Sequence, residues 1–284
     1  MKNSSQLFNK LFTQKVFGEL VNKRTHPIFH EIVEDNLENP NLHSNGEIVS
    51  TLYALMAKSY RNEYFYQNTL LNSLLLGKHS VRTTTALSQV PIGKAVADFI
   101  LINGKAVVYE IKSDLDNFDR LESQIQAYYQ AFDHVCVVAP ESSFPKLQAM
   151  FSEGPVGIYT LTKRNTISAT YKKEPIADRS KLSHQSLFKL LRKREYEHIV
   201  YSYYGFLPKA TPVFWYEACE SLFSKIPMDQ AYPMVLNTLK QRVSAKQEHL
   251  LDVPYSLRSL AYFSKESGAN PASLQSFLTQ QYGR

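Results

Sequence analysis

Apolar residues near the start of the chain recur at the spacing of helices. Between residues 8 and 20 they return every three or four positions, which predicts a helix. A second helix is predicted from Ile28 to Asp35, and a third from Glu47 to Ser59. We therefore interpret residues 1–59 as an N-terminal helical segment.

The pattern changes from helix to strand in the next part of the chain. Tyr60 to Leu76 has a leucine-rich stripe at helical spacing, and Val81 to Val90 reads as an extended segment. The apolar runs Phe99–Ile102 and Lys105–Ser113 flank Asn103-Gly104, a two-residue hairpin signal that requires left-handed backbone at both positions. These runs predict two antiparallel strands.

Further alternation of helix and strand follows the hairpin. A helix is predicted from Phe118 to Phe132 and an apolar strand from His134 to Ala139, which implies a crossover onto the same sheet. Two more strands are predicted at the sheet edge, Gly157–Leu161 and Thr166–Tyr171. The fold class is therefore α/β, with a mixed sheet core at residues 60–172 flanked by helices.

The last part of the chain has helical periodicity throughout. A polar linker, Lys172–Ser186, precedes it, and residues 173–284 are predicted to form a helical accessory domain. Trp215 begins an apolar helix and is predicted to lie in its core. No catalytic pattern, internal repeat or Walker motif occurs in this region.

The strand after the hairpin ends in charged residues. Alternate side chains of a strand share a face, so Glu110 and Lys112 lie on the side that begins with Ala106 and Val108. The hairpin brings Asp98 opposite this charged end. Two carboxylates and one ammonium group thus converge at the edge of an apolar sheet.

Such a cluster suits metal-assisted hydrolysis of a phosphodiester. Two carboxylates, Asp98 and Glu110, can bind hard divalent cations, which polarise a phosphate and activate a water. Lys112 can orient that water or neutralise the transition state. The alternative is a surface Glu–Lys pair at a strand end, which is common.

The surrounding sequence adds two features to this cluster. Gln124 and Tyr128 are four residues apart on the following helix, and Glu63 lies near the start of an upstream helix. In order and spacing, Asp98, then eleven residues, then Glu-Ile-Lys, then Q-x-x-x-Y resembles the PD-(D/E)XK nuclease superfamily, in particular its RecB-like branch. The resemblance covers Tyr60 to Val138 and implies a restriction-endonuclease-like sheet core.

The resemblance implies a role for each matching residue. The activity expected is that of a nuclease that requires Mg²⁺ or Mn²⁺, with DNA expected as its substrate ahead of RNA; an endonuclease is one expectation, and the choice between endonuclease and exonuclease stays open. The expected metal ligands are Asp98, Glu110, the Ile111 carbonyl and Glu63; the expected catalytic residues are Asp98, Glu110 and Lys112; and the expected substrate-binding residues are Gln124, Tyr128 and Arg120.

Composition limits which binding partners, metal sites and cellular compartments fit the chain. A net charge of +6 is compatible with nucleic acid binding without being diagnostic of it. Two cysteines exclude a four-thiolate zinc or iron–sulfur site, and a reducing cytoplasm fits best. No apolar run approaches the length of a membrane span, so no membrane association is expected.

Two other functions stay open beside an active nuclease. One is a catalytically silent nucleic-acid-binding module. The other is an effector whose nuclease is triggered by a protein partner that binds the C-terminal helices. A compact nuclease with a large accessory region suits phage defence or DNA repair.

Overall fold

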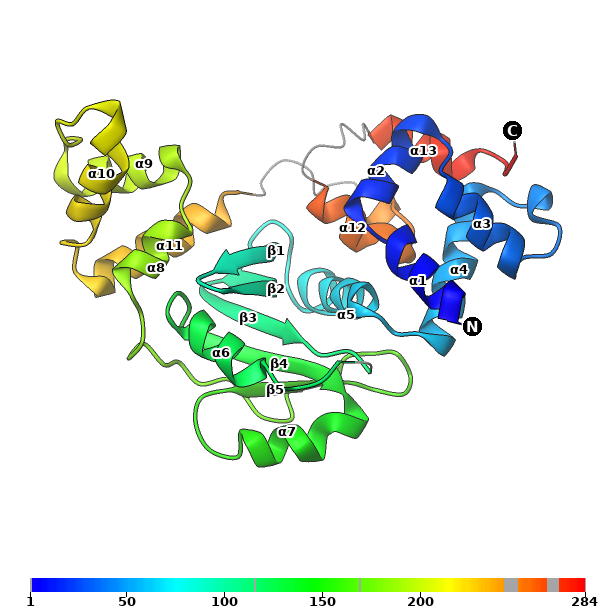
Figure 1. Cartoon of the computed structure of the whole chain (residues 1–284), viewed down its shortest axis with the longest axis horizontal. Coiled ribbons are helices and arrows are strands. Elements are labelled where there is room, and N and C mark those ends of the chain that lie inside the picture. Colours follow the sequence, from blue (N-terminus) through cyan, green and yellow to red (C-terminus); the bar gives the residue numbers. More distant parts are fainter. Residues whose placement is uncertain (1, 115, 169, 243–249, 265–270, 284) are drawn as a thin grey trace.

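Five strands form one mixed sheet at the centre of the computed structural model (Figure 1). Neighbouring strands in the first half are antiparallel, whereas the third, fourth and fifth are parallel. This confirms the predicted mixed α/β class. In sheet order and chain order alike, the strands are β1 (Thr85–Ile92), β2 (Ala95–Asn103), β3 (Lys105–Ile111), β4 (His134–Pro140) and β5 (Gly157–Leu161).

The structure describes residues 2–114, 116–168, 170–242, 250–264 and 271–283. Helices precede the sheet, as the periodicity predicts. They are α1 (Lys2–Leu11), α2 (Gln14–Lys23), α3 (Pro27–Asn36), η1 (Pro40–Leu42), α4 (Asn45–Ser59), α5 (Glu63–Leu70) and a π-helix, η2 (Leu71–Lys78).

Helices cover both faces of the sheet (Figure 1). α5 and η2 pack on one face, and α6 (Leu121–Tyr129) packs on the other, where it carries the chain from β3 to its parallel neighbour β4. Two shorter helices, η3 (Glu141–Ser143) and α7 (Phe144–Met150), lie between β4 and β5. Along β3, Val107, Tyr109 and Ile111 face α5, whereas Ala106 and Val108 face α6. The predicted alternation of β3 is therefore confirmed.

The helices after the sheet divide into two packing groups. The first group joins the hydrophobic cluster on the α6 face of the sheet. It consists of α8 (His184–Lys189), α9 (Lys193–Tyr204), η4 (Pro212–Phe214), α10 (Trp215–Phe223) and α11 (Met228–Lys240). The second group returns to the N-terminal helices and consists of η5 (Leu250–Asp252), η6 (Tyr255–Leu257), α12 (Arg258–Phe263) and α13 (Pro271–Thr279).

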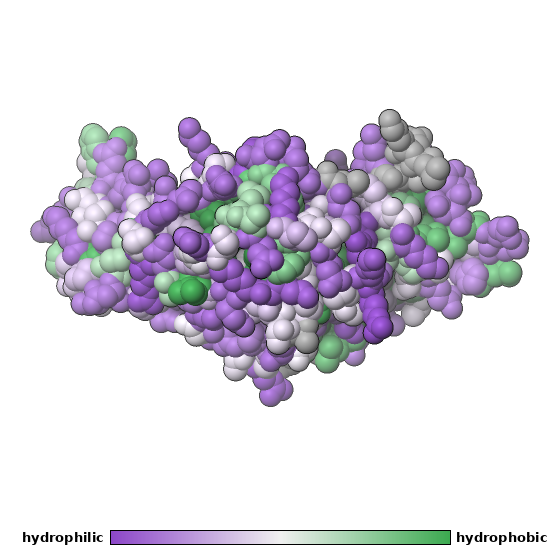
Figure 2. Space-filling view, turned by 90° about the horizontal axis from the view of Figure 1, so that it is seen from below, coloured by the Kyte–Doolittle hydropathy of each residue, from purple (hydrophilic) through white to green (hydrophobic). Residues whose placement is uncertain are grey.

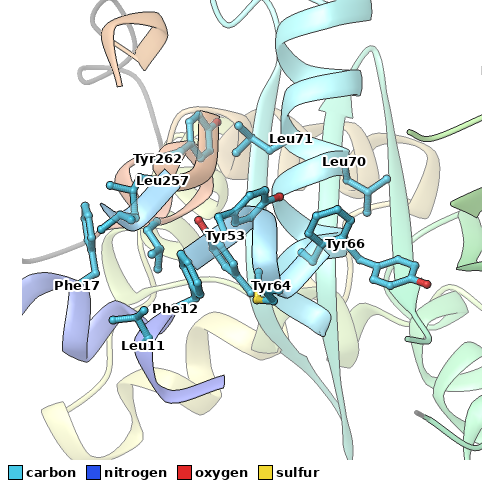
Figure 3. Packing of buried hydrophobic residues seen from close by; sticks show 14 of the residues in the cluster. Leu11, Phe12, Phe17, Tyr53, Tyr64, Tyr66, Leu70, Leu71, Leu257 and Tyr262 are labelled. Atoms are coloured by element: carbon cyan, nitrogen blue, oxygen red, sulfur yellow. The ribbon is translucent and has the colours of Figure 1, made fainter. Parts of the chain in front are cut away.

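The returning helices complete the core of the N-terminal segment. Figure 3 shows Phe12, Tyr53 and Tyr64 packing beside Leu257 and Tyr262, which lie about 200 residues later in the chain. Figure 1 shows α1 to α4 and α12 to α13 as one bundle at one end of the molecule. The domain limits at residues 59 and 172 stay a prediction; in the structure, the two packing groups divide the region after the sheet.

Three details of the sequence interpretation are wrong. Gly104 has a φ of +72°, but Asn103 stays in extended β2 and pairs with Lys105, so left-handed backbone occurs at one turn position rather than two. Ile167 forms an isolated bridge to Leu161 of β5, and the described residues between 166 and 171 form no strand. Trp215 is half-buried rather than fully in the core: it packs against the hydrophobic cluster, and its indole N–H donates to Glu197 Oε1 at 2.6 Å.

Among the described helices, none has both the length and the apolar character needed to cross a membrane.

Candidate functional site at the β2–β3 fork

The antiparallel strands β2 and β3 separate at one end, and Asp98 fills the fork. Their pairing stops at Phe99 and Tyr109, two residues before β3 ends. The backbone N–H of Ile111, left without a strand partner there, donates to Asp98 Oδ2 at 2.8 Å. Because N–H and C=O of one strand residue point to the same side, the Ile111 carbonyl also faces the fork.

Glu110 and Lys112 form a buried ion pair at the end of β3. Glu110 is 1% exposed and Lys112 is 9% exposed, an unusual degree of burial for either side chain. Lys112 Nζ lies 2.9 Å from Glu110 Oε1. The alternative of a solvated Glu–Lys pair at a strand end therefore does not describe these residues.

Helix α6 supplies a polar partner to each member of the pair. Lys112 Nζ donates to Gln124 Oε1 at 2.9 Å, and the Tyr128 hydroxyl lies 2.5 Å from Glu110 Oε2 and 2.8 Å from the Val96 carbonyl. The four-residue spacing places both side chains on the helix face toward the sheet. Burial, followed by the charge of Glu110, raises the pKa of Tyr128, so its hydroxyl keeps the proton that it donates.

Arg120 differs from the other two predicted substrate-binding residues. It is the N-cap residue of α6, and its side chain is exposed rather than drawn toward the Glu110–Lys112 pair. Its predicted contact with substrate stays a prediction.

Glu63 approaches the site from the first turn of α5. The Asn62 side chain caps this helix by accepting from the Phe65 N–H at 3.0 Å, which fixes where the helix begins. Glu63 Oε1 accepts from Gln89 Nε2 at 2.8 Å. Arg61, two residues before Glu63, pairs with Asp114 at 2.8 Å.

The acidic groups repel one another. Burial and then the charges of Glu110 and Glu63 raise the pKa of Asp98 well above its usual range, although Ile111 and Lys112 act in the opposite direction. Glu63 keeps contact with solvent, yet protein atoms around its carboxylate, and then the charges of Asp116 and Glu110, raise its pKa too. A cation placed among these groups would relieve the repulsion.

The donor set fits a hard divalent cation, although a closed cage is not formed. Carboxylate and carbonyl oxygens are the ligands that Mg²⁺ and Mn²⁺ prefer, and Asp98, Glu110 and Ile111 present them at the fork. No group of three or more His, Cys, Asp or Glu placed to hold a metal occurs in the described part of the chain. The predicted ligands, including Glu63, therefore do not form a preassembled three-carboxylate site. Lys112 and Tyr128 each contact one Glu110 oxygen.

Residues outside the predicted set of site residues line the approach to the fork. Gln67 Nε2 lies 3.4 Å from the Asp98 carbonyl, and Asp116 Oδ2 accepts from both the N–H and the hydroxyl of Ser113. With Glu63 and Gln89 they line a cavity of about 470 Å³. Gln67 lies one helical turn after Glu63, a spacing visible in the sequence, whereas Gln89 carries no such signal.

Comparison with known proteins gives one match. No curated protein and no solved structure matches the chain. The family model of bacteriophage P4 protein cII matches residues 56–261, more than half of the chain and a span that includes Glu63, the fork and α6. The chain therefore belongs to the bacteriophage P4 protein cII family.

Proposed function

We propose that this protein is a metal-dependent nuclease of the PD-(D/E)XK type, RecB-like branch, that hydrolyses DNA phosphodiester bonds in phage defence or DNA repair. One observation carries the proposal. The buried Glu110–Lys112 pair meets Asp98 at the end of an apolar sheet, and two side chains of α6 hold the pair in place. Burial of this kind is costly for charged groups and is typical of functional sites.

Each residue has a task in the proposed reaction. A bound Mg²⁺ or Mn²⁺ would polarise the phosphate and acidify a water at the fork. Asp98 and Glu110 supply its carboxylate ligands. Lys112 orients the attacking water or neutralises the charge that develops on phosphate. Gln124 accepts a hydrogen bond from Lys112 beside its ion pair with Glu110, and Tyr128 fixes the second Glu110 oxygen.

The net charge supports DNA as the substrate, and the two free cysteines support a cytoplasmic location. The net charge of +6 favours approach of a polyanion such as DNA. Cys136 and Cys219 are both free and buried, which suits a reducing cytoplasm.

An exposed surface on α9 and α10 favours a nuclease triggered by a protein partner. Figure 2 shows hydrophobic residues gathering at the end of the molecule that these helices form. The stretch from 201 to 216 contains no Asp or Glu, and its chemistry suits a protein with a complementary apolar face. The exposed large hydrophobic side chains in it are Tyr201, Tyr203, Phe206, Val213, Phe214 and Tyr216.

The test is cleavage of circular single-stranded and duplex DNA in Mn²⁺, Mg²⁺ or EDTA. Wild type is compared with Lys112→Ala, and with Lys105→Ala as a matched control because Lys105 is an exposed lysine at the start of the same strand. Loss of Lys112 should lower the rate by orders of magnitude, since its charge acts on the transition state. Lys105→Ala should cut like wild type. Melting curves of both variants establish that they are folded.

The outcomes separate the candidate functions. Metal-dependent cutting that Lys112→Ala abolishes supports the nuclease, and cutting of closed circles shows an endonuclease. Binding of DNA without cutting by wild type favours the silent module or the partner-triggered effector. DNA cleavage that persists in the Lys112→Ala variant would contradict the proposed site.

A further inference from the structure

The cavity beside the fork is bounded by the N-terminal helices as well as by the sheet. Its carboxylate end contains Glu63 and Asp116. Its far end is formed by Asn9 of α1 and Gln14 of α2, and by Leu260 of α12. The N-terminal segment, for which the proposed chemistry has no role, therefore forms a wall of the space that leads to the site.

The far end has the chemistry of a site for a nucleobase. It is lined by uncharged residues, Asn9, Gln14, Tyr60 and the mostly buried Phe12, whose ring stacks on that of Tyr64. A base is recognised by neutral donors and acceptors at its edge and by a flat apolar surface against its face. A phosphate, in contrast, would require cationic groups there.

Some of these polar atoms are hydrogen-bonded within the protein, and others are free to form a hydrogen bond with a ligand. Asn9 accepts from Asn62 at 2.7 Å and donates to the Tyr60 hydroxyl at 2.8 Å, so Tyr60 can still donate its own proton. Gln14 Nε2 donates to the Leu260 carbonyl at 3.0 Å. Gln14 Oε1 has no hydrogen-bond donor among the described residues. One donor and one acceptor are thus free to meet the edge of a base.

The size of the cavity limits what can enter. A volume of about 470 Å³ lies within the range of small-ligand sites and is ample for one nucleotide. A base that is stacked and paired in a duplex cannot enter, because both its faces and its pairing edge are occupied.

We propose that this cavity binds one unpaired nucleotide of the substrate, with its base between α1, α2 and Tyr60 and its phosphate at the fork. The inference rests on the proposed function and extends it. The substrate is then single-stranded DNA, or a duplex at a frayed end, rather than intact duplex.

The test is fluorescence anisotropy in EDTA, where binding is measured without cleavage. The probes are a labelled twelve-nucleotide single strand, a strand of the same length built of abasic residues, and a blunt hairpin duplex. Wild type should bind the normal strand about tenfold or more tightly than the abasic strand or the duplex, because only the normal strand offers an unpaired base.

Two variants and a control locate the effect. Tyr60→Phe removes only a hydroxyl, and Gln14→Ala removes the free acceptor. Each should reduce the preference for the normal strand over the abasic strand several-fold. Asn22→Ala removes an exposed amide from the same helix as Gln14, outside the cavity, and should keep the wild-type preference.

The results separate this inference from the nuclease proposal. Equal binding of the normal and abasic strands, or unchanged preference in both cavity variants, overturns the cavity assignment even if DNA is cut. Base-dependent binding that both variants reduce, in a protein that never cuts DNA, upholds the cavity and overturns the nuclease.

Discussion

The surroundings of Asp98 disfavour the charged form of its carboxylate. Its carboxylate is partly buried, accepts one hydrogen bond from Ile111, and faces the charges of Glu110 and Glu63, which together raise its pKa. The folded protein therefore holds a proton on Asp98 at pH values where the unfolded chain has lost it. Folding then becomes less favourable as the pH rises through the unfolded pKa toward the raised, folded one.

Asp98→Asn should therefore be more stable than wild type at pH 8 in EDTA, with the gain shrinking toward pH 4. Asparagine keeps an oxygen that can accept from Ile111 but has no charge to bury. Thermal melting across this pH range measures the effect. Mg²⁺ should raise the melting temperature of wild type and leave that of the variant unchanged. A variant less stable than wild type at pH 8 would contradict the electrostatic account.

The sequence predicts single residues well where a local period decides their position. Alternation along β3 and the four-residue spacing in α6 place Glu110, Lys112, Gln124 and Tyr128 correctly around one point. The contact of Gln89 with Glu63 joins residues 26 apart, and it depends on a left-handed Gln89 with a φ of +52°. No period in the sequence encodes such a contact.

At the scale of elements, Asp133 joins three parts of the chain. It is 2% exposed at the start of β4. Tyr232 of α11 donates to its Oδ1 at 2.8 Å, Arg179 of the linker donates to its Oδ2 at 3.0 Å, and its carbonyl accepts from Asp178 N–H. The predicted linker is therefore fastened to the sheet rather than free.

Asp133 should contribute stability that disappears in acid. Burial acts to raise its pKa, but hydrogen bonds from His134, Tyr232 and Arg179 outweigh burial and lower the pKa to about 2. A lowered folded pKa stabilises the native state above the unfolded pKa, and this stability is lost as the pH falls from about 4 to about 2. Its size is about 2 kcal/mol.

Urea unfolding of Asp133→Asn at pH 5 and pH 3 tests this. The variant should be less stable than wild type by about 2 kcal/mol at pH 5, and the difference should narrow at pH 3. Asp229→Asn, an exposed acid on α11, is the matched control and should follow wild type at both values. A difference that is the same at both pH values would show that Asp133 acts without its charge.

Elements with strong local signals are confirmed, and those set by tertiary contacts differ from expectation. The predicted helix after residue 60 contains its four buried leucines, but its second half winds as the π-helix η2. In the region predicted to be helical throughout, the chain breaks between α8 and α9. There the Leu190 carbonyl accepts from Arg242 Nη2 at 2.6 Å, a contact that sequence periodicity does not carry.

At the scale of the whole molecule, the last two helices, α12 and α13, pack against helices from the start of the chain. Phe277 of α13 is 1% exposed and packs its ring 6.1 Å from that of Phe29 in α3. α12 also contacts α2 and α5, and α13 contacts α2 and α4. The bundle that walls the cavity is therefore made from both ends of the described chain.

Phe277→Ala should cost roughly 3–5 kcal/mol, because it leaves a cavity in this bundle. Hydrogen exchange should quicken in α1 to α4 more than in the strands, because one face of the sheet packs in the second hydrophobic cluster, away from Phe277. Phe206→Ala, at an exposed phenylalanine, should change stability by less than about 0.5 kcal/mol. Equal loss of protection in the bundle and the sheet would show that the two unfold as one unit.

This closure by distant helices has a consequence during synthesis. The early helices end at Ser59, and the segment that covers them begins at Leu250. At a synthesis rate of about 5–20 residues per second, the ribosome takes on the order of ten to forty seconds to reach that segment. Throughout that time the apolar faces of α1 to α4 that the late helices cover are open to chaperones. The wall that Leu260 gives to the cavity is missing as well, so a nascent chain can complete its sheet and its acidic fork before it can hold a base.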